Sequence, residues 1–496
     1  MPLINSAFSS LDWLIFLTYF CVLAFSSYWF SRVKINSSRE YFTASNTMPT
    51  LAVAISILAT SQSAATFLGV PEFSYANNFT LLGFYFSSLL AVIFVAKFFV
   101  PVFYEMRAIT VYELLEKRYG QSAKQQAGMM FLIGRVMASG ARLYIAALAI
   151  SMILFLDITL PHMLFSIFIL LLGALAYAYF GGVKSVILSD VIQAVTYVSA
   201  GIVVVVYLYI SLDGVDILAV LNADDKLRII DTSFDANFGI LALVSGWLLL
   251  NIAAFGLDQD MTQRVLTCKN KDEASRSLII SILFTIPIVL LFLLIGALLY
   301  VFYENTTLTQ SFEGEKITIF MYYILNEMPE GVRGFVTVGA IAAALSSTNS
   351  VLSAMASVAI EDLYRPYKLK KSPQTDEAHF MRASRNAVLL FAFALFAMAI
   401  LSYFWQRNFS LSLIDFALGV MAFAYTGLLG VFFSAIFTNR GNSKTVFFAL
   451  IGGFLTVLVL QPYMFGIKIG FAWQITLGTL VAFGIMQSGK KSAYNV

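Results

Sequence analysis

The chain has 496 residues, of which 59% are hydrophobic and 12% are charged. A typical soluble domain carries about 25% charged residues, so this composition excludes an ordinary soluble enzyme, a nucleic-acid-binding protein and a disordered regulator. The formal net charge is only +3, which implies no polyanionic partner.

Apolar runs divide the chain into predicted membrane spans. No Lys or Arg precedes the first run, so we expect a retained transmembrane helix there and not a cleavable signal peptide. About 20 apolar residues cross the hydrocarbon core. Runs of that length predict thirteen spans. The last two are separated by only a short gap, so twelve spans is the alternative count. They cover residues 10–31, 50–75, 80–104, 125–155, 158–179, 185–211, 238–263, 277–303, 331–360, 383–404, 411–437, 444–465 and 467–487.

The basic residues give the predicted orientation. With the N-terminus outside, 22 of the 31 Lys and Arg residues fall in cytoplasmic loops and 6 in outer loops. Arg264 is assigned to a cytoplasmic loop and Arg333 to an outer loop. Arg333, Arg385, Lys444 and Lys468, at the very ends of spans, are counted with the adjoining loops, and three residues, Lys97, Arg135 and Arg142, fall deeper inside spans. This excess follows the positive-inside rule and predicts a multi-pass membrane protein with a cytoplasmic C-terminus.

Small and hydroxyl residues interrupt the second span. Residues 59–67 read Ala-Thr-Ser-Gln-Ser-Ala-Ala-Thr-Phe, and Gly69 and Pro71 follow. This segment favours an unwound helix whose free backbone carbonyls can coordinate a cation. The alternative is a face of small residues that packs against another helix.

The seventh span has a similar interruption at Gly256, which has Asn251 on one side and Asp258 on the other. The two interrupted spans are five apart. Because five is odd, a five-helix repeat inserts upside down relative to its copy. Broken helices at corresponding positions of inverted halves indicate a transport site near the middle of the membrane.

Further polar residues lie in the sixth and ninth spans. Ser346, Asn349 and Ser350 share one helix face. The hydroxyls of Ser346 and Ser347 complete an oxygen cage suited to sodium, a hard cation; interhelical hydrogen bonding is the alternative. Asp190 begins the sixth span, either as a cation ligand or as an interfacial cap.

Two arginines lie within the fourth span. Arg135 and Arg142 are seven residues apart, about two helical turns, so both point to one side of the helix. An ion pair with Asp or Glu explains a buried arginine structurally, and an anionic substrate explains it functionally, since Arg binds carboxylates bidentately. The sequence alone does not decide between these two explanations.

No feature of the sequence indicates an enzyme. There is no HExxH motif, and Asp258 and Asp260 are two residues apart, on different faces of a helix. The two histidines are far apart and the two cysteines lie in or beside apolar runs, so no metal or disulfide site is expected. The sequence also shows no filter loop and no ring of charged residues of the kind that would indicate a channel.

Five segments in chain order resemble the sodium:solute symporter family over essentially the full length. The implied fold is LeuT-like, with two inverted five-helix repeats, one helix before them and two after. The segments are Ser38–Phe42, Thr110–Gly120, Gly181–Gln193, Ala342–Ser347 and Glu361–Pro366.

This resemblance divides the chain into five parts. It also implies a plasma membrane location, in a bacterium the inner membrane. The parts are an N-terminal helix and cytoplasmic loop (1–49), a first repeat (50–211), an acidic extracytoplasmic loop (212–237), a second repeat (238–437), and two C-terminal helices with a short cytoplasmic tail (438–496).

The resemblance implies co-transported sodium, a small-molecule substrate and the bilayer as partners, with no nucleic acid and no obligate protein partner. The implied sodium ligands are the carbonyls of Ala59, Gln62 and Ala343 and the hydroxyls of Ser346 and Ser347. Some relatives bind a second sodium, which maps to Asp190, Ser346, Asn349 and Ser350; Asn349 stands where those relatives have a hydroxyl residue.

The implied function is sodium-coupled symport, with the sialic-acid carriers nearest in the site residues. In that branch Arg135 holds the substrate carboxylate, while Tyr85 replaces an amide residue. Sodium-coupled carriers of sugars or amino acids, and a proton-coupled symporter of the same fold, are the alternatives. The expected substrate-binding residues are Ser61, Ser63, Thr66, Tyr85, Arg135, Asn251, Phe255 and Gln259.

Overall fold

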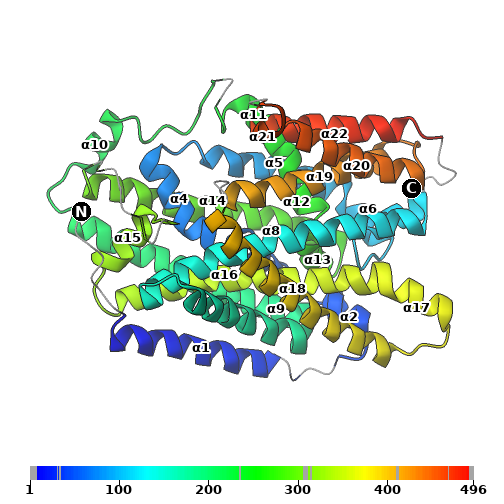
Figure 1. Cartoon of the computed structure of the whole chain (residues 1–496), viewed down its shortest axis with the longest axis horizontal. Helices are drawn as coiled ribbons and strands as arrows, with labels where there is room; N and C mark the ends of the chain where they lie inside the picture. Colours follow the sequence, from blue (N-terminus) through cyan, green and yellow to red (C-terminus); the bar gives the residue numbers. More distant parts are fainter. Residues whose placement is uncertain are drawn as a thin grey trace.

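In the described part of the chain, all regular secondary structure is helical apart from one short hairpin, as the computed structural model in Figure 1 shows. The structure describes residues 8–30, 32, 35–233, 236–304, 306, 311–312, 315–408, 413–466 and 469–490. Strands β1 (Ser311–Phe312) and β2 (Glu315–Lys316) form the antiparallel hairpin. Most of the long helices lie roughly along one direction, as expected for a bundle that crosses a membrane (Figure 1).

The helices follow one another in this order: α1 (Ser10–Phe30), α2 (Ser38–Thr43), η1 (Ala44–Asn46), α3 (Thr50–Ser61), α4 (Ala64–Ala76), α5 (Leu82–Phe98), α6 (Val100–Glu105), α7 (Glu113–Tyr119), α8 (Gln121–Phe155), α9 (Leu160–Ser211), α10 (Ile217–Ala223), α11 (Ile240–Val244), α12 (Gly246–Gly256), α13 (Gln259–Val265), α14 (Lys271–Phe302), α15 (Ile319–Asn326), α16 (Val332–Ser357), η2 (Val358–Tyr364), α17 (Arg365–Lys371), α18 (Glu377–Asn408), α19 (Leu413–Phe437), α20 (Ser443–Val459), α21 (Pro462–Phe465) and α22 (Phe471–Gln487).

Within the described residues, each predicted span contains helix. By length and composition, 7 helices in the described part of the chain can cross a membrane, or up to 9 if each bent pair counts as one span. Three shorter apolar helices lie near the C-terminus. One non-helical residue, Gly182, separates the predicted fifth and sixth spans, so that α9 consists of two helices joined at this break. A Cβ at this residue, which has a φ of +58°, would lie 2.5 Å from the Tyr41 carbonyl oxygen, so glycine is required.

The two predicted helix interruptions are confirmed. Helix α3 ends at Ser61 and α4 begins at Ala64, with Gln62 and Ser63 in extended backbone between them. Ser63 then caps α4 through a capping box with Thr66, which explains why the helix restarts there. The second break lies between α12 and α13, and the α11–α12 segment meets α13 at 56°.

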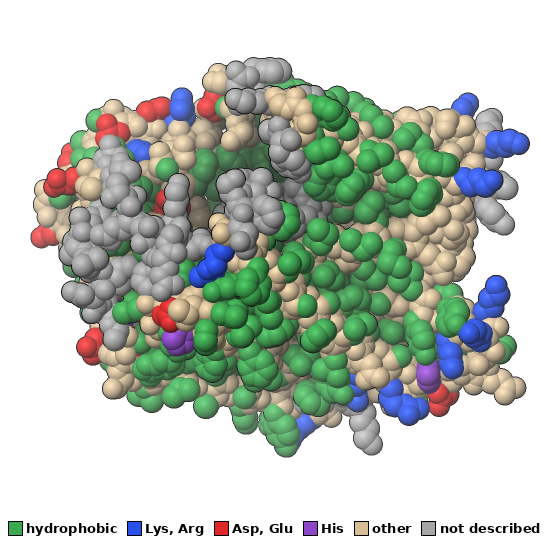
Figure 2. Space-filling view, viewed as in Figure 1, with side chains coloured by type: hydrophobic (Ala, Val, Ile, Leu, Met, Phe, Trp, Pro, Cys, Tyr) green, Lys and Arg blue, Asp and Glu red, His purple; other side chains and the backbone are tan. Residues whose placement is uncertain are grey.

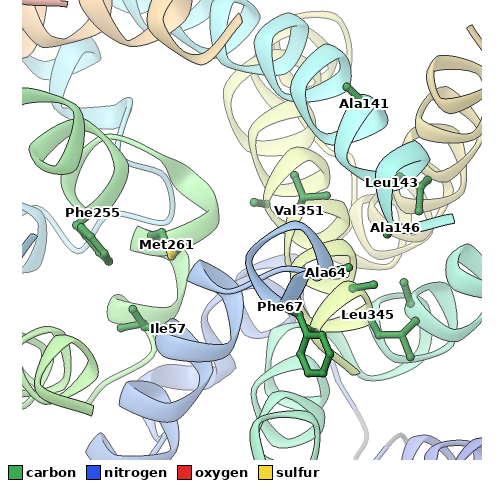
Figure 3. Close-up of a cluster of buried hydrophobic side chains, with 14 of the residues drawn as sticks. Ile57, Ala64, Phe67, Ala141, Leu143, Ala146, Phe255, Met261, Leu345 and Val351 are labelled. Carbon is green, nitrogen blue, oxygen red and sulfur yellow. The ribbon is translucent and has the colours of Figure 1, made fainter. Parts of the chain in front are cut away.

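Helix α16 forms the centre of the bundle. In the span Val332–Lys371, which α16 begins, 89% of the most apolar 18-residue stretch is buried. Helix α16 packs most extensively against α9. Figure 3 shows apolar side chains from α3, α4, α8, α12, α13 and α16 around the break between α3 and α4, with Phe67, Leu345 and Val351 among them. The two broken helices therefore lie next to the best-packed part of the molecule.

The surface separates into an apolar middle and two charged ends. Figure 2 shows hydrophobic side chains over the middle of the molecule, with Lys and Arg gathered at the end that carries α17 and acidic side chains mainly at the end that carries α10. Apolar side chains such as Phe393 and Leu390 of α18 are more than 60% exposed. A bilayer is the environment that would cover such a belt.

Two arginines that the sequence assigns to loops are instead buried in ion pairs. Arg264 lies in α13 and contacts Asp190 of α9, with both side chains fully buried. Arg333 lies in the first turn of α16, and its Nη2 is 2.9 Å from Oδ2 of Asp12 in α1. The positive-inside rule counts charges along the chain and does not detect a charge that a partner neutralises inside the bundle.

Candidate functional site

A cavity of about 190 Å³ lies where the two helix breaks meet. Its walls come from the α3–α4 break, α5, α8, α12, α13, α14, α16, α18 and α19. Most of the lining is apolar or carries hydroxyl groups, and four charged residues stand among it. The polar and charged residues that line it are Thr60, Ser61, Ser63, Tyr85, Ser88, Arg135, Ser139, Arg142, Asn251, Asp258, Asp260, Thr285, Ser347, Thr348 and Tyr425.

The residues predicted to hold sodium lie together between α3 and α16. The Ser346 hydroxyl donates to the Ala59 carbonyl at 2.8 Å, across the two helices, and lies 3.1 Å from the Ala343 carbonyl. The Ser347 hydroxyl lies 3.4 Å from the same Ala343 oxygen. Gln62 is buried at the first extended position after α3. Two hydroxyls and two carbonyls thus converge at the end of the broken helix.

Asp190 was expected as a cation ligand or an interfacial cap, and the structure shows it in a buried ion pair. Its Oδ2 accepts hydrogen bonds from the Ser56 hydroxyl and from Nη2 of Arg264, the latter at 3.2 Å. Its Oδ1 is buried with no hydrogen-bond partner among the described residues. Asn349 donates its amide nitrogen to Ser189, and its own Oδ1 is likewise buried and unpartnered there. Among the described residues, both of these acceptor oxygens therefore lack a partner, one on α9 and one on α16.

Arg135 is part of an ion-pair cluster. Its Nε lies 3.2 Å from Oδ1 of Asp258, its Nη2 lies 3.2 Å from Oδ2 of Asp260, and Nη2 also pairs with Oδ2 of Asp258. Asp258 also accepts a hydrogen bond from the Tyr425 hydroxyl, and it caps α13 by accepting one from the Asp260 amide. The cluster thus ties α8 and α19 to the break between α12 and α13.

Six of the eight predicted substrate-binding residues line the cavity, and two do not. Ser61, Ser63, Tyr85, Arg135, Asn251 and Phe255 are on its wall. Thr66 is used in the cap of α4. Gln259 is fully buried elsewhere, where its Nε2 donates to the Ile109 carbonyl at 2.9 Å and its Oε1 accepts from the Val111 amide at 3.0 Å.

Three lining residues could not be expected from the sequence. Trp247 lies at the start of α12, and Tyr425 and Met421 come from α19. Tyr425 reaches Asp258 across 167 residues of chain. Within an apolar run, one tyrosine among many carries no signal of such a contact.

The family model of the sodium:solute symporters matches residues 41–453 of the chain. The chain is 27% identical over 492 residues to the sodium/sialic acid symporter NanT of Aliivibrio fischeri, covering 96% of this chain and 92% of that protein. It is 24% identical over 483 residues to the sodium/sialic acid symporter SiaT of Proteus mirabilis, covering 95% and 93%. A sodium/glucose cotransporter of Vibrio parahaemolyticus is 26% identical over 413 residues, covering 79% and 75%.

The solved structures give the fold. A substrate-bound, outward-open Na⁺-coupled sialic acid symporter superposes with a TM-score of 0.84 at 21% identity, covering 98% of this chain and 99% of the other. Mhp1, a nucleobase-cation-symport-1 family transporter, matches with a TM-score of 0.55 at 12% identity, covering 92% and 96%. The predicted LeuT-like fold is confirmed. The chain belongs to the sodium:solute symporter family, which makes it a sodium-coupled secondary transporter and not an enzyme.

Proposed function

We propose that the protein moves a small organic carboxylate, such as a sialic acid, into the cell together with sodium. The observation that carries this proposal is the cavity at the two helix breaks, where the arginines of α8 stand among hydroxyl groups. Arginine binds carboxylates with parallel hydrogen bonds. The sialic acid symporters among the relatives, NanT and SiaT, support the same class of substrate.

The uncharged lining suits a polyhydroxylated substrate. The Ser61 and Ser63 hydroxyls, the Tyr85 phenol and the Asn251 amide supply donors and acceptors around the cavity. Nδ2 of Asn251 is buried and has no partner among the described residues. A buried donor left unpaired costs free energy, so a substrate oxygen at this position gains a hydrogen bond that the protein itself does not make. Phe255 covers one side of the bound solute.

The first sodium ion binds between α3 and α16. Its ligands are the carbonyls of Ala59, Gln62 and Ala343 and the hydroxyls of Ser346 and Ser347. The short distances between the Ser346 hydroxyl and two of these carbonyls support this site, because the same oxygens can turn toward a cation. Sodium favours oxygen ligands of this kind.

A second sodium ion binds between α9 and α16, with Asp190, Ser346, Asn349 and Ser350 as its ligands. The unpartnered Oδ1 atoms of Asp190 and Asn349 support this assignment. The amide oxygen of Asn349 takes the place of a hydroxyl as ligand. Arg264 holds the other oxygen of Asp190, so only one oxygen of that carboxylate remains for the ion.

Transport follows alternating access by the two inverted repeats, residues 50–211 and 238–437. Sodium between α3 and α16 fixes the extended segment at Gln62 and Ser63, which forms one wall of the substrate cavity. Sodium must then raise the affinity for substrate by the factor by which substrate raises the affinity for sodium. The basic end of the molecule faces the cytoplasm. Each charge carried inward gains about 2.3 kcal/mol per 100 mV of membrane potential.

Uptake into proteoliposomes tests this proposal. Radiolabelled N-acetylneuraminate is offered with an inward sodium gradient or with potassium in its place, and unlabelled sialic acids, hexoses, amino acids and monocarboxylates are added as competitors. We expect sodium-dependent accumulation that only carboxylates of matching size inhibit. No sodium-dependent accumulation of N-acetylneuraminate, or accumulation that a neutral hexose or a zwitterionic amino acid inhibits as strongly as unlabelled sialic acid does, would contradict the proposed substrate class.

A further inference from the structure

A second cavity, of about 620 Å³, lies apart from the substrate cavity and shares no lining residue with it. Three basic side chains line it: Arg39 of α2, Arg107, which follows α6, and Lys269, which follows α13. No described carboxylate is among its lining residues. Helices α2 and α6 lie toward the end of the molecule that carries α17, which the basic residues predict to be cytoplasmic (Figure 1). We call this cavity the basic pocket.

The three basic side chains have no anionic partner in the part of the chain that the structure describes. None of them belongs to an ion pair there. Nη2 of Arg39 donates to the carbonyl oxygen of Arg107 at 2.7 Å, while the side chains of Arg107 and Lys269 donate to no described residue. Three like charges around one cavity repel one another, so an anion between them is attracted by all three.

The backbone at Arg107 has a conformation that L residues seldom adopt. Its φ is +53°, in the left-handed region, which costs free energy unless the surroundings hold it. The hydrogen bond from Arg39 to the Arg107 carbonyl is one restraint, and the Arg107 amide donates to the Tyr104 carbonyl at 3.1 Å. This turn places the Arg107 side chain on the wall of the basic pocket. Strained backbone of this kind is common at binding sites.

The loop that carries Lys269 is fixed from two sides. The Tyr104 hydroxyl of α6 donates to the Cys268 carbonyl at 2.8 Å. Asn46 of η1 donates its side-chain amide to the Leu266 carbonyl. The three walls of the pocket are thus joined to one another by hydrogen bonds. A site that is joined in this way before the ligand arrives loses little conformational freedom on binding.

The basic pocket lies at the depth expected for lipid headgroups. Its α6 wall ends the membrane span Leu82–Glu105, so the pocket is at the end of a span and not within one. The segment Ser38–Asn46 meets Thr50–Ser61 at 116°, and it therefore runs mainly across the end of the bundle. Anionic phospholipids give the cytoplasmic leaflet its negative surface potential at this depth.

We propose that the basic pocket binds the phosphate group of an anionic ligand, which is either the headgroup of a phospholipid or a soluble phosphate ester. The planar guanidinium of Arg107 matches the spacing of phosphate oxygens, and the Lys269 ammonium adds a point charge. Three cationic groups suit a phosphate, which offers several acceptor oxygens, better than a single carboxylate. The proposal does not depend on which solute the substrate cavity carries.

Binding of two probes to the purified, delipidated full-length protein in detergent tests the proposal. Bound phosphatidylglycerol is counted by native mass spectrometry, with zwitterionic phosphatidylcholine beside it. Glycerol 1-phosphate, which carries a phosphate without acyl chains, is titrated by calorimetry. The wild type is compared with Arg107→Gln/Lys269→Gln. The matched control Lys371→Gln/Arg382→Gln removes the same two charges from exposed positions of α17 and α18 outside the pocket.

We expect the wild type and the control to bind at least one probe, with a dissociation constant about tenfold or more higher in Arg107→Gln/Lys269→Gln, because two charge-assisted contacts are lost. Both double variants should melt near the wild-type temperature, since the substituted side chains are exposed. Tighter binding of phosphatidylglycerol than of glycerol 1-phosphate identifies a lipid headgroup as the ligand, and equal affinity identifies a soluble ester. Binding of neither probe, or equal binding to the wild type and to the pocket variant, overturns the proposal.

Discussion

Arg264 and Asp190 form an ion pair in the interior of the bundle, with Nη2 of the arginine 3.2 Å from Oδ2 of the aspartate and neither side chain exposed. The pair connects α13, which follows one helix break, to α9, which packs along α16. The same guanidinium bonds to the Ser56 hydroxyl at 2.8 Å, so α3 is included as well. One buried side chain thus links α3, α9 and α13, which carry part of the proposed ion and substrate sites.

Removal of Arg264 should destabilise the protein strongly. Breaking a buried ion pair from one side leaves an uncompensated charge, which typically costs about 3–5 kcal/mol. We expect Arg264→Gln to lower the free energy of unfolding by about that amount. The double variant Arg264→Gln/Asp190→Asn should lose less, because no lone carboxylate remains. Unfolding in mixed detergent micelles measures both, with Arg276→Gln as the exposed control. Equal losses in the single and double variants would show that the pair is not coupled.

Loss of two hydroxyls should weaken sodium dependence. Ser346→Ala/Ser347→Ala removes the side-chain oxygens proposed for the first ion, while Ala cannot disturb the helix. We expect the sodium concentration for half-maximal uptake to rise by about tenfold or more, which corresponds to about 1.4 kcal/mol. Ser384→Ala is the control, since this buried serine donates to the Phe380 carbonyl of its own helix and bonds no other residue in the described part of the chain. An unchanged sodium response in the double variant would place the ion elsewhere.

The second ion makes a separate prediction. If two ions bind before transport, as proposed, initial rates of uptake should rise cooperatively with sodium concentration in the wild type. Asn349→Leu removes the amide oxygen proposed as a ligand, and the response should become hyperbolic while the first site remains. Measured charge movement per substrate should fall by one elementary charge. A response that stays cooperative, with the same charge movement, would argue that Asn349 is not a ligand.

Much of the fold follows from local patterns that the sequence displays. Apolar runs predict the helices, and the hydroxyl-rich stretch at residues 59–67 predicts the break that the structure has at Gln62 and Ser63. Such features depend on neighbouring residues alone. The grouping of the oxygens proposed for the first ion was expected from the family resemblance, which maps a sodium site onto these positions.

The pairing of charges could not be predicted in this way. Arg135 meets Asp258 across 123 residues, and Arg264 meets Asp190 across 74. Which carboxylate reaches which arginine depends on how α8, α9 and α13 pack, and neither composition nor spacing contains that information. Gln259 was assigned to the substrate by position in the family, while its amide is engaged with the backbone at Ile109 and Val111.

The different environments of Asn251 and Gln259 lead to opposite expectations for two similar substitutions. Gln259→Ala removes hydrogen bonds at 2.9 and 3.0 Å to a buried loop, and each group left unpaired costs about 1–3 kcal/mol. It should lower the melting temperature while the KM for uptake stays near the wild-type value. Asn251→Ala removes an amide whose Nδ2 has no partner among the described residues, so its stability should change little. Its KM should rise about fivefold to tenfold, as expected for one lost hydrogen bond of about 1–1.5 kcal/mol. Uptake kinetics and thermal unfolding of the two variants, measured side by side, test both expectations. A raised KM with unchanged stability in Gln259→Ala would show that Gln259 contacts the substrate after all.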